Sequence, residues 1–562
     1  MSRRITAFSL TFATLLAGLL LLLGNLQIVH GTEYARAARR SAVQVETVPA
    51  ARGRLLDRKG RVLAEDRAVW TARVSATAGA ETVARLKALC REEGIAWEGT
   101  EDIPDVPPAL LARIRGEDLP GVTFALQAAR VGSGRLAPQL LGRVGKMSEE
   151  EWETYRTKGY ALDALVGKDG AEAAFEDLLR GVPGEKAVER DRSGRITGEG
   201  YVRIPRPGTD VTLTLDRDLQ RAVRHALTRY LARHPDAGGA ACAVLDVGDG
   251  GVLALVSLPD YDPASFSSDY ADLAADPDRP LMNRALQGLY APGSVFKLVT
   301  AAAALEEGVL TPETKILDTG KYTYYASPQP QCWLYRQEGR THGMETVDRA
   351  IADSCNVFFY DAGRRVGIET LGAYARALGL GVSTGIEVAG EETGVVAGPD
   401  YAAAAGLPWY EGSVLSAAIG QENNRFTPLQ LAHLTATLAG DGHRWQVHLR
   451  KEGNTPYVPR SLGTADLAPK NLAAIRRGMG LAAEQGALAA AFSGLPVEVG
   501  AKTGSAQVDG AADSNAVLAA FAPFDAPEIA LALVVEQGGG GSELGETAAE
   551  ILRAWFGYYS GH

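Results

Sequence analysis

A chain of 562 residues, 46% of them hydrophobic, is long enough for two or three domains that each bury a core. The formal net charge of −11 argues against nucleic acid as a general partner. Four cysteines are too few for a disulfide framework, which excludes the small secreted scaffolds that depend on one.

An uncharged stretch from Ile5 to Ile28 follows Arg3 and Arg4 at the start of the chain. As a helix it would be roughly 36 Å long, enough for a tilted crossing of a bilayer. The two arginines place the N-terminus in the cytoplasm and the rest of the chain outside. A signal peptide cleaved near residues 35–37 is the alternative, but the apolar run is longer than a usual signal core. We therefore predict an uncleaved transmembrane anchor within residues 1–30.

Residues 31–205 contain turn signals between short apolar stretches. Lys59-Gly60 separates two such stretches and predicts a hairpin, and residues 191–195 predict a second hairpin turn. Apolar side chains recur at helical spacing between Ala171 and Leu179, which predicts a short amphipathic helix.

Residues 206–562 alternate between strand and helix signals. Strands are predicted at 211–215, 241–247, 252–256, 497–507, 516–521 and 529–535, and helices at 216–233 and 543–556. A largely helical middle separates the early strands from the late ones. This order predicts an α+β domain, in which helices cover the faces of an antiparallel sheet.

Ser294 and Lys297 lie at the start of a further predicted helix. Pro292 and Gly293 mark a turn before it, and Gly308 marks its end. Side chains three positions apart share a helix face, so the Lys297 amine can reach the Ser294 hydroxyl and take its proton. Backbone N–H groups at the helix start can stabilise an oxyanion. An exposed helix start without catalytic function is the alternative for this pair alone.

Two more short motifs occur later in the chain. Ser354-Cys355-Asn356 is the only Ser-x-Asn sequence, and Lys502-Thr503-Gly504 is the only Lys-Thr/Ser-Gly sequence. Ser294 to Lys297 is likewise the only Ser-x-x-Lys. Alone, the second motif could cap a helix and the third could be a solvated strand end. Together and in this order, the three resemble the penicillin-binding transpeptidase and serine β-lactamase superfamily.

The resemblance extends over nearly the whole chain. Sequences similar to those of class B penicillin-binding proteins occur at residues 52–60, 142–145, 167–181, 283–285, 290–293, 342–343, 420–421 and 427–432. It implies a membrane anchor at 1–30, an elongated, mainly β pedestal or dimerisation-type domain at 31–205 and a transpeptidase domain at 206–562.

The resemblance also implies a role for each motif residue. Ser294 would attack the carbonyl of a D-Ala-D-Ala stem peptide, with Lys297 as the base, its pKa lowered by burial and by the Lys502 cation. Ser354 would relay a proton to the leaving nitrogen, and Asn356 would bind the substrate amide. Lys502 and Thr503 of the third motif would bind the substrate carboxylate, and Gly504 would let that backbone approach closely. The N–H groups of Ser294 and Ser505 would form the oxyanion hole.

The sequence departs from the family pattern at three places. Ser505 replaces the commoner threonine, Glu422 replaces a usual glycine, and the stretch 514–517 lacks the aromatic residue often found there. The last departure affects substrate detail more than the reaction itself.

The partners implied by the resemblance are the membrane, the lipid-linked or polymerised peptidoglycan stem peptide, and β-lactam antibiotics. The second region is too short for both a pedestal and a glycan polymerase, so we expect a separate polymerase from the division or elongation machinery. No cofactor, metal or nucleic acid is expected. The alternatives are a β-lactamase or D,D-carboxypeptidase, which delivers water to the acyl-enzyme, and a non-catalytic β-lactam sensor or scaffold.

Cys332 and Cys355 raise a separate hypothesis. Cys355 lies inside the second motif, in a domain expected to face the oxidising exterior. A disulfide between the two would make activity redox-dependent by straining the Ser354 loop. Two small buried core residues are the alternative.

Overall fold

The computed structural model describes residues 2–34, 43–75, 78–95, 97, 99, 102–103, 105–162, 164–190, 196–327, 329–507 and 513–559. The chain forms two compact units, one of residues 1–53 and 180–208, the other of residues 54–179 and 209–562. The predicted domain boundaries after residues 30 and 205 stay a prediction, because compactness alone does not define a domain.

The first unit holds the apolar N-terminal helix and a small sheet. α1 spans Ser2–Gly24 and continues into the π-helix η1, Asn25–Val29. Residues Ile5–Val29 have a mean hydropathy of 2.2 and are exposed, so the helix is long and apolar enough to cross a membrane; a signal sequence passes the same test. The sheet is antiparallel, with β7 (Gly184–Arg190) between β1 (Val43–Val48) and β8 (Ile196–Arg203). The hairpin turn predicted at 191–195 lies outside the described residues.

The second unit begins with the predicted hairpin. β2 (Leu55–Leu56) pairs antiparallel with β3 (Val62–Val74), and Gly60 between them has a φ of +79°. β3 pairs with β4 (Val122–Gly132), while β2 also pairs in parallel with β9 (Val211–Leu213). With β15 (Arg450–Glu452) these strands form a five-stranded sheet in the order β15-β9-β2-β3-β4. The sheet therefore joins the segment before residue 179 to the later part of the chain.

Short elements complete this segment. The predicted helix near 171–179 is present as two pieces, α7 (Gly170–Ala174) and α8 (Glu176–Leu179). The others are α3 (Ala80–Glu92), α4 (Pro108–Glu117), η2 (Gly134–Leu136), α5 (Pro138–Leu141), β5 (Val144–Lys146), α6 (Glu149–Tyr155), η3 (Arg156–Lys158) and β6 (Leu165–Gly167).

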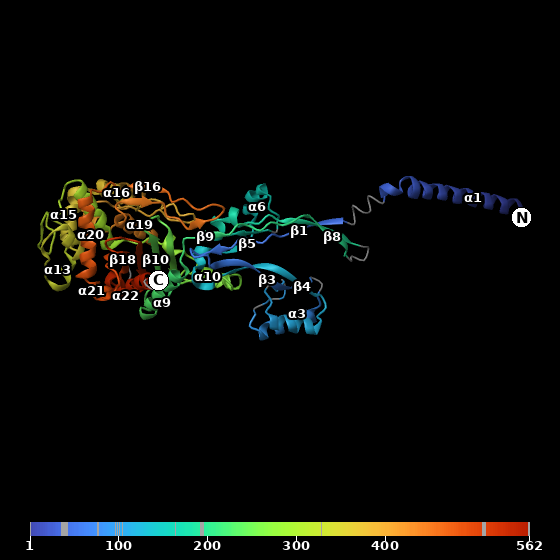
Figure 1. Ribbon diagram of the computed structural model, residues 1–562, viewed down its shortest axis with the longest axis horizontal. Helices are drawn as coiled ribbons and strands as arrows, with labels where there is room; N and C mark the ends of the chain where they lie inside the picture. Colours follow the sequence, from blue (N-terminus) through green and yellow to red (C-terminus); the bar gives the residue numbers. More distant parts are fainter. Residues whose placement is uncertain are drawn as a thin grey trace. The chain divides into compact units, whose positions relative to one another are not determined.

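An antiparallel five-stranded sheet organises the remainder of the second unit (Figure 1). Its order is β11-β10-β19-β18-β17, with the strands β10 (Gly239–Asp246), β11 (Val252–Leu258), β17 (Gly500–Ala506), β18 (Asn515–Ala522) and β19 (Ile529–Glu536). Its strands are buried along almost their whole length, because both faces are covered. The predicted strands in these regions are confirmed.

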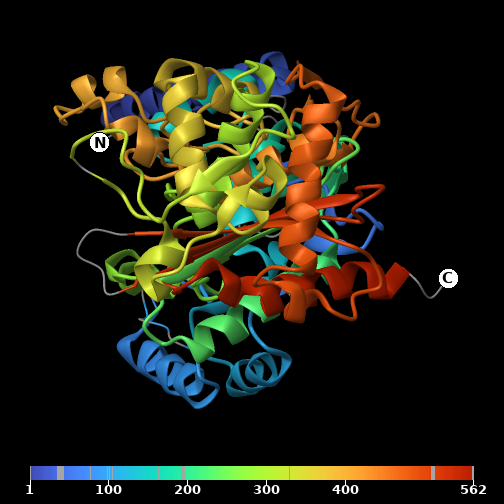
Figure 2. The same cartoon turned by 90° about the vertical axis from the view of Figure 1, so that its left-hand side faces the viewer.

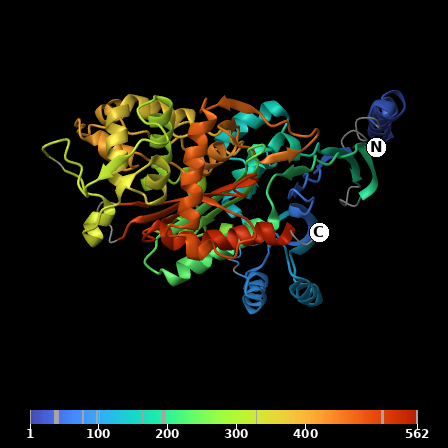
Figure 3. The same ribbon diagram turned by 60° about the vertical axis from the view of Figure 1, so that its left-hand side comes forward.

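Helices pack on both faces of this sheet, as Figures 2 and 3 show. α9 (Arg217–Arg233) and α22 (Gly545–Tyr559) pack against the face that carries Cys242 and Leu531. α12 (Lys297–Glu306) and α19 (Pro428–Ala439) share a core with the opposite face, which carries Ala243 and Ala532. Neighbouring strand residues thus point to opposite cores, as the pleat requires. The predicted α+β fold is confirmed.

The second unit contains further elements. They are α10 (Phe266–Ala275), α11 (Arg284–Gln287), η4 (Gly293–Phe296), β12 (Ile316–Asp318), α13 (Trp333–Glu338), β13 (Gly343–Glu345), α14 (Val347–Ala352), α15 (Asn356–Val366), α16 (Ile368–Ala377), α17 (Pro399–Ala404), α18 (Ser413–Ala418), β14 (His443–Trp445), β16 (Ser461–Thr464), α20 (Pro469–Glu484), α21 (Ala489–Phe492) and η5 (Gly541–Leu544).

Candidate active site

Ser294 lies in the short 3-10 helix η4, directly before α12. Its side chain is partly exposed, whereas Lys297, one turn later, is fully buried. Gly293 has a φ of +53°, and a Cβ there would lie 2.9 Å from the backbone oxygen of Ser505. Only glycine lets this turn lie so close to β17. The predicted helix is confirmed, although its first turn is 3-10 rather than α.

The Lys297 amine makes three hydrogen bonds to the second motif. Nζ lies 2.7 Å from Ser354 O, 3.2 Å from Ser354 Oγ and 2.6 Å from Asn356 Oδ1. None of these three hydrogen bonds is made to Ser294, the partner expected from the sequence. Two of the partners can only accept, and the Ser354 hydroxyl can also donate. A charged amine can donate to all three oxygens, and a neutral amine can donate to two of them and accept from the Ser354 hydroxyl.

Lys502 reaches the same hydroxyl from the sheet edge. Its Nζ lies 3.0 Å from Ser354 Oγ and 3.0 Å from the backbone oxygen of Thr503. The Lys502 side chain is 1% exposed, so this residue is not a solvated strand end. Ser354 Oγ thus lies between two buried amines, and the three motifs converge at one point of the fold.

The second motif lies at the start of α15. Cys355 is the N-cap residue, and Asn356 is the first residue of the helix. No side chain caps this helix, so Ser354 and Asn356 are not simple capping residues. Ser354 has a φ of +53°, a left-handed conformation that costs a residue with a side chain about 1–2 kcal/mol. This conformation turns both its carbonyl and its hydroxyl toward Lys297.

The third motif packs against the nucleophile turn. A Cβ on Gly504 would lie 2.5 Å from Pro292 O and 3.4 Å from the Ser294 nitrogen. The glycine therefore lets β17 approach the backbone of Ser294. Ser294, Ser354, Asn356 and Thr503 are partly exposed, whereas Lys297 and Lys502 are buried. This packing brings β17 close to the backbone nitrogen of Ser294.

Gly420 and Glu422 belong to a loop that contacts this turn. Gly420 O accepts a hydrogen bond of 3.0 Å from Gly293 N, and Gln421 Nε2 donates to Ser505 O at 3.3 Å. Glu422 has a φ of +60°, in the region that favours glycine. Glu422, which replaces the glycine usual in the family, therefore occupies a left-handed backbone conformation. Ser505 keeps a useful hydroxyl, since its Oγ accepts from Gly541 N at 3.2 Å.

Burial changes the protonation of both lysines. It lowers the pKa of Lys297 to about 8, while the Cys355 and Cys332 thiols act in the opposite direction. Burial, followed by the charge on Lys297, holds the pKa of Lys502 well below its ordinary value. The charge repulsion expected between the two amines therefore lowers the pKa of Lys502 and not that of Lys297. A lysine that loses its proton near neutral pH can act as a general base.

Comparison with known proteins identifies the family. The family model described as "Penicillin binding protein transpeptidase domain" matches residues 240–556, and that of the "Penicillin-binding Protein dimerisation domain" matches residues 47–213. This chain belongs to the class B penicillin-binding proteins. The penicillin-binding protein therefore combines an N-terminal apolar helix with a dimerisation domain and a transpeptidase domain.

Relatives match along nearly the whole chain. The peptidoglycan D,D-transpeptidase MrdA of Escherichia coli strain K12 is 30% identical over 594 residues, covering 95% of this chain and 92% of its own. A chain of the solved structure "Structural coordination of polymerization and crosslinking by a peptidoglycan synthase complex" is 33% identical, with a TM-score of 0.78 and coverages of 99% and 98%. Pseudomonas aeruginosa PBP2, solved in complex with WCK 5153, is 28% identical, with a TM-score of 0.69 and coverages of 91% and 96%.

A buried cluster of possible metal ligands lies directly behind the second motif. Asp318, Cys332, His342 and Cys355 each offer one ligand atom, and these atoms lie within 4.8 Å of one another. The His342 ring nitrogen Nδ1 is 2.7 Å from Asp318 Oδ2 and 3.5 Å from Cys332 Sγ. Two thiols, an imidazole and a carboxylate match the donors and the number of ligands that zinc takes in structural sites. The residues present therefore fit a zinc ion, which would cross-link the segments that support Ser354.

The cluster also changes the protonation of its members. Burial works to lower the pKa of His342, but contacts with Cys332 and Asp318 outweigh it and raise this pKa to about 9. The Cys355 thiol lowers the pKa of Cys332 by hydrogen bonding, and the same contact raises the pKa of Cys355. All four cysteines, including these two, are buried free thiols.

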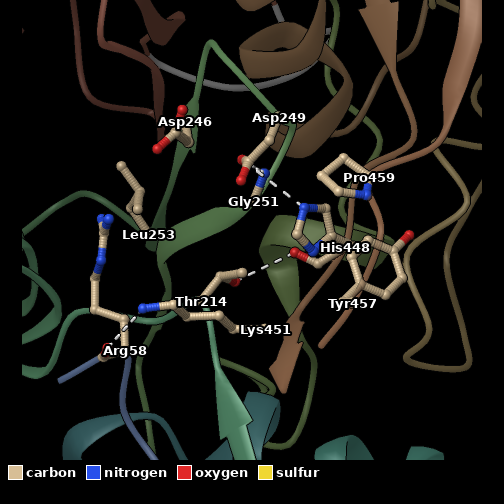
Figure 4. A pocket seen from close by; sticks show the side chains of 10 residues that line it. All are labelled: Arg58, Thr214, Asp246, Asp249, Gly251, Leu253, His448, Lys451, Tyr457 and Pro459. Atoms are coloured by element: carbon tan, nitrogen blue, oxygen red, sulfur yellow. Dashed lines mark hydrogen bonds and ion pairs between the residues drawn. The ribbon is translucent and has the colours of Figure 1, made fainter. Parts of the chain in front are cut away.

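A separate polar pocket lies where the β2–β3 hairpin meets the central sheet (Figure 4). Lys451 Nζ donates to Arg58 O at 3.0 Å, and His448 Nε2 lies 3.8 Å from Asp249 Oδ1. None of its ten lining residues belongs to the three motifs. The pocket therefore has no place in the chemistry of Ser294.

Sequence reasoning missed part of the surroundings of the site. It named the Cys332 and Cys355 pair and the His342-Gly343 sequence, but it did not find Asp318 or predict a metal site. These four ligands come from four separate segments, so no short spacing between them identifies the cluster. The presence of two cysteines and a histidine near the second motif was the one available signal.

Proposed function

We propose that this penicillin-binding protein is a membrane-anchored peptidoglycan D,D-transpeptidase that cross-links stem peptides through an acyl-enzyme on Ser294. The observation that carries the proposal is the link from Lys297 through Ser354 Oγ to Lys502, with distances of 3.2 and 3.0 Å, beside the Ser294 turn. This link supports the assignment of Lys297 as the base and Ser354 as the proton relay, with Lys502 as the second amine beside them.

In acylation, neutral Lys297 takes the proton of the Ser294 hydroxyl as its oxygen attacks the penultimate D-Ala carbonyl of the stem peptide. The N–H groups of Ser294 and Ser505 hold the oxyanion, since β17 packs against the Ser294 backbone. Ser354 passes a proton to the leaving nitrogen, and the terminal D-alanine departs. Because Ser354 Oγ contacts both amines, it can be reprotonated directly.

Substrate binding uses the remaining motif residues. Asn356 orients Lys297 through the 2.6 Å contact and binds the substrate amide with its other polar atom. Lys502 and Thr503 bind the terminal carboxylate, and Gly504 allows the backbone to come close. In the second half of the reaction, an amine from a neighbouring strand takes the acyl group. β-Lactams resemble the D-Ala-D-Ala end, so they acylate Ser294 too.

The helix at Ile5–Val29 anchors the protein in the membrane. Arg3 and Arg4 before it favour a cytoplasmic N-terminus, which places the catalytic unit on the extracytoplasmic side, where peptidoglycan lies. In this proposal residues 1–30 form the anchor, 31–205 the pedestal and 206–562 the transpeptidase domain.

A separate glycan polymerase supplies the strands that are cross-linked. Support comes from the 33% identical chain, which belongs to a peptidoglycan synthase complex that coordinates polymerization and crosslinking. Localisation of the tagged protein in growing cells will assign the polymerase to the division or the elongation machinery.

Labelling with a fluorescent penicillin tests the function. The full-length protein in detergent should form a covalent adduct that persists for many minutes, and Ser294→Ala should abolish it. Ser493→Ala is the matched control, because the hydroxyl of this serine donates to Ala490 O alone among the described residues and lies outside the motifs.

Two results would overturn the proposal. An adduct that turns over within seconds would identify a β-lactamase or carboxypeptidase, which delivers water to the acyl-enzyme. Absence of any adduct in folded protein would leave a non-catalytic scaffold.

A further inference from the structure

Cys332 and Cys355 are close enough to react with each other. Their sulfur atoms lie within 4.8 Å, so they must approach by at most about 3 Å to form a disulfide. Both are fully buried, yet Ser354 and Asn356 on either side of Cys355 are partly exposed. The pair therefore adjoins the partly exposed residues of the second motif.

The surroundings of Cys332 link its sulfur to the second motif. The backbone N–H of Asn356, at the N-terminus of the eleven-residue helix α15, donates to Cys332 Sγ at 3.3 Å. This contact ties the Cys332 sulfur to the same residue whose side chain binds Lys297. The other two cysteines provide a contrast, because Cys90 and Cys242 lie in separate apolar clusters. Reactivity should thus be confined to one pair.

We propose that Cys332 and Cys355 form a reversible oxidation site, in which a disulfide displaces Ser354 and stops acylation of Ser294. The oxidant is a peroxide. The effect on acylation rests on the function proposed above, whereas formation of the disulfide does not.

The reaction proceeds in two steps. Cys332 loses its proton and attacks one oxygen of hydrogen peroxide; an S–O bond forms, the O–O bond breaks, and the departing hydroxide takes that proton to become water. Cys355 then loses its proton and attacks the Cys332 sulfur; an S–S bond forms, the S–O bond breaks, and a second water leaves. Two thiols lose two electrons in total, and one peroxide becomes two waters.

The disulfide acts on Ser354 through the adjacent peptide. Drawing Cys355 toward Cys332 must shift Ser354, whose carbonyl and hydroxyl both bind Lys297. A shift of about 1 Å would lengthen these contacts beyond hydrogen-bond distance. Misplacement of a catalytic group by about 1 Å can cost roughly 100-fold in rate.

A zinc ion and the disulfide would compete for the same sulfur atoms. With an ion held by Asp318, Cys332, His342 and Cys355, both sulfurs are ligands and cannot attack the oxidant or each other. Zinc should therefore protect the pair, and a chelator should expose it. This competition gives the proposal a measurement that does not depend on activity.

The experiment uses full-length protein in detergent, treated with hydrogen peroxide and then alkylated without reduction. We expect peptide mass analysis to show a Cys332–Cys355 cross-link with Cys90 and Cys242 still alkylated. The cross-link should form at least tenfold faster after chelation than with added zinc sulfate. Penicillin labelling should fall at least tenfold in the oxidised protein and return on reduction.

Cys332→Ser is the critical variant, because its hydroxyl keeps an acceptor for Asn356 N–H but cannot form the disulfide. Its labelling rate should not respond to peroxide, and a Cys90→Ala/Cys242→Ala variant should respond like the wild type. The absence of a 332–355 cross-link in chelated protein, or equal rates with and without zinc, would overturn the proposal. So would a cross-linked protein that is labelled as fast as the reduced one. Failure of the reduced protein to label would contradict only the proposed function.

Discussion

The hydroxyl of Ser354 lies 3.0 Å from the amine of Lys502, although 148 residues separate them in the chain. The same hydroxyl lies 3.2 Å from the amine of Lys297. One oxygen thus connects the helix that carries the nucleophile to the edge of the central sheet. Loss of that oxygen should disconnect the two amines without disturbing the core.

We expect Ser354→Ala to lower the rate of penicillin acylation by about 10²–10³-fold, because a positioned proton relay typically contributes that much. The measurement is the second-order rate constant for labelling by a fluorescent penicillin, with Ser493→Ala as the control. The thermal unfolding midpoint should stay within about 4 °C of the wild type. A rate within threefold of the wild type would show that Ser354 is not the relay.

The pH dependence of acylation should follow Lys297. Since the pKa of this lysine is lowered to about 8, the base form increases as pH rises through that value. Acylation rates should therefore rise from pH 6 to pH 9 with an apparent pKa of about 8. Stopped-flow labelling across this range measures it. A flat profile, or one that falls over the same interval, would exclude neutral Lys297 as the base.

The same lowered pKa affects stability. The unfolded chain keeps its proton up to the ordinary lysine pKa, whereas folded Lys297 loses it near 8, so the unfolded state binds more protons between these values. The contribution of Lys297 to the free energy of unfolding should increase with pH over that window. Lys297→Met should remove this contribution, seen as a smaller rise in unfolding midpoint between pH 7.5 and 9.5. Equal rises in both proteins would contradict the assignment.

Glu422→Gly should stabilise the protein by about 1 kcal/mol, because Glu422 has a φ of +60° and glycine adopts this conformation without the Cβ clash. Arg425 Nη1 donates to the backbone oxygen of Glu422, so the contact survives the change. Urea denaturation monitored by circular dichroism measures the difference. Glu392→Gly is the control, since Glu392 lacks a positive φ and its replacement should be neutral or destabilising.

Arg284→Met should destabilise the protein by about 3 kcal/mol, because it leaves Glu536 without its buried partner. Arg284 is 1% exposed, and its Nε lies 3.0 Å from Glu536 Oε1. The comparison is Arg340→Met, which removes an exposed pair with Glu338 and should cost at most about 1 kcal/mol. Similar losses in both variants would mean that burial of the Arg284 pair has no special effect.

Local signals predicted much of the fold. The hairpin at Leu55–Leu56 and Val62–Val74 follows from Gly60, whose positive φ fits a tight turn. The strands of the central sheet were readable because each is a short apolar run between turns. The parallel pairing of β2 with β9 was not predicted, since residues 55 and 211 share no local pattern and meet only in the folded chain.

The convergence of the three motifs was predicted, but not all of the contacts between them. The three motifs converge as expected, yet Lys297 binds Ser354 and Asn356 instead of Ser294. Helical spacing predicts only the helix face on which a lysine lies. The long side chain can bind any acceptor within its reach, so its partner is not predicted. Two of those acceptors, the carbonyl and the hydroxyl of Ser354, depend on its left-handed backbone conformation. No sequence rule predicts that conformation for a serine.

The shared sheet β15-β9-β2-β3-β4 bears on how the catalytic region can be produced in isolation. A fragment that starts at residue 206 would keep β9 but lose its neighbour β2. The N–H and C=O groups of β9 along that side would then be open to other chains, a common cause of aggregation. A soluble version should therefore begin before Leu55 and dispense only with the apolar helix.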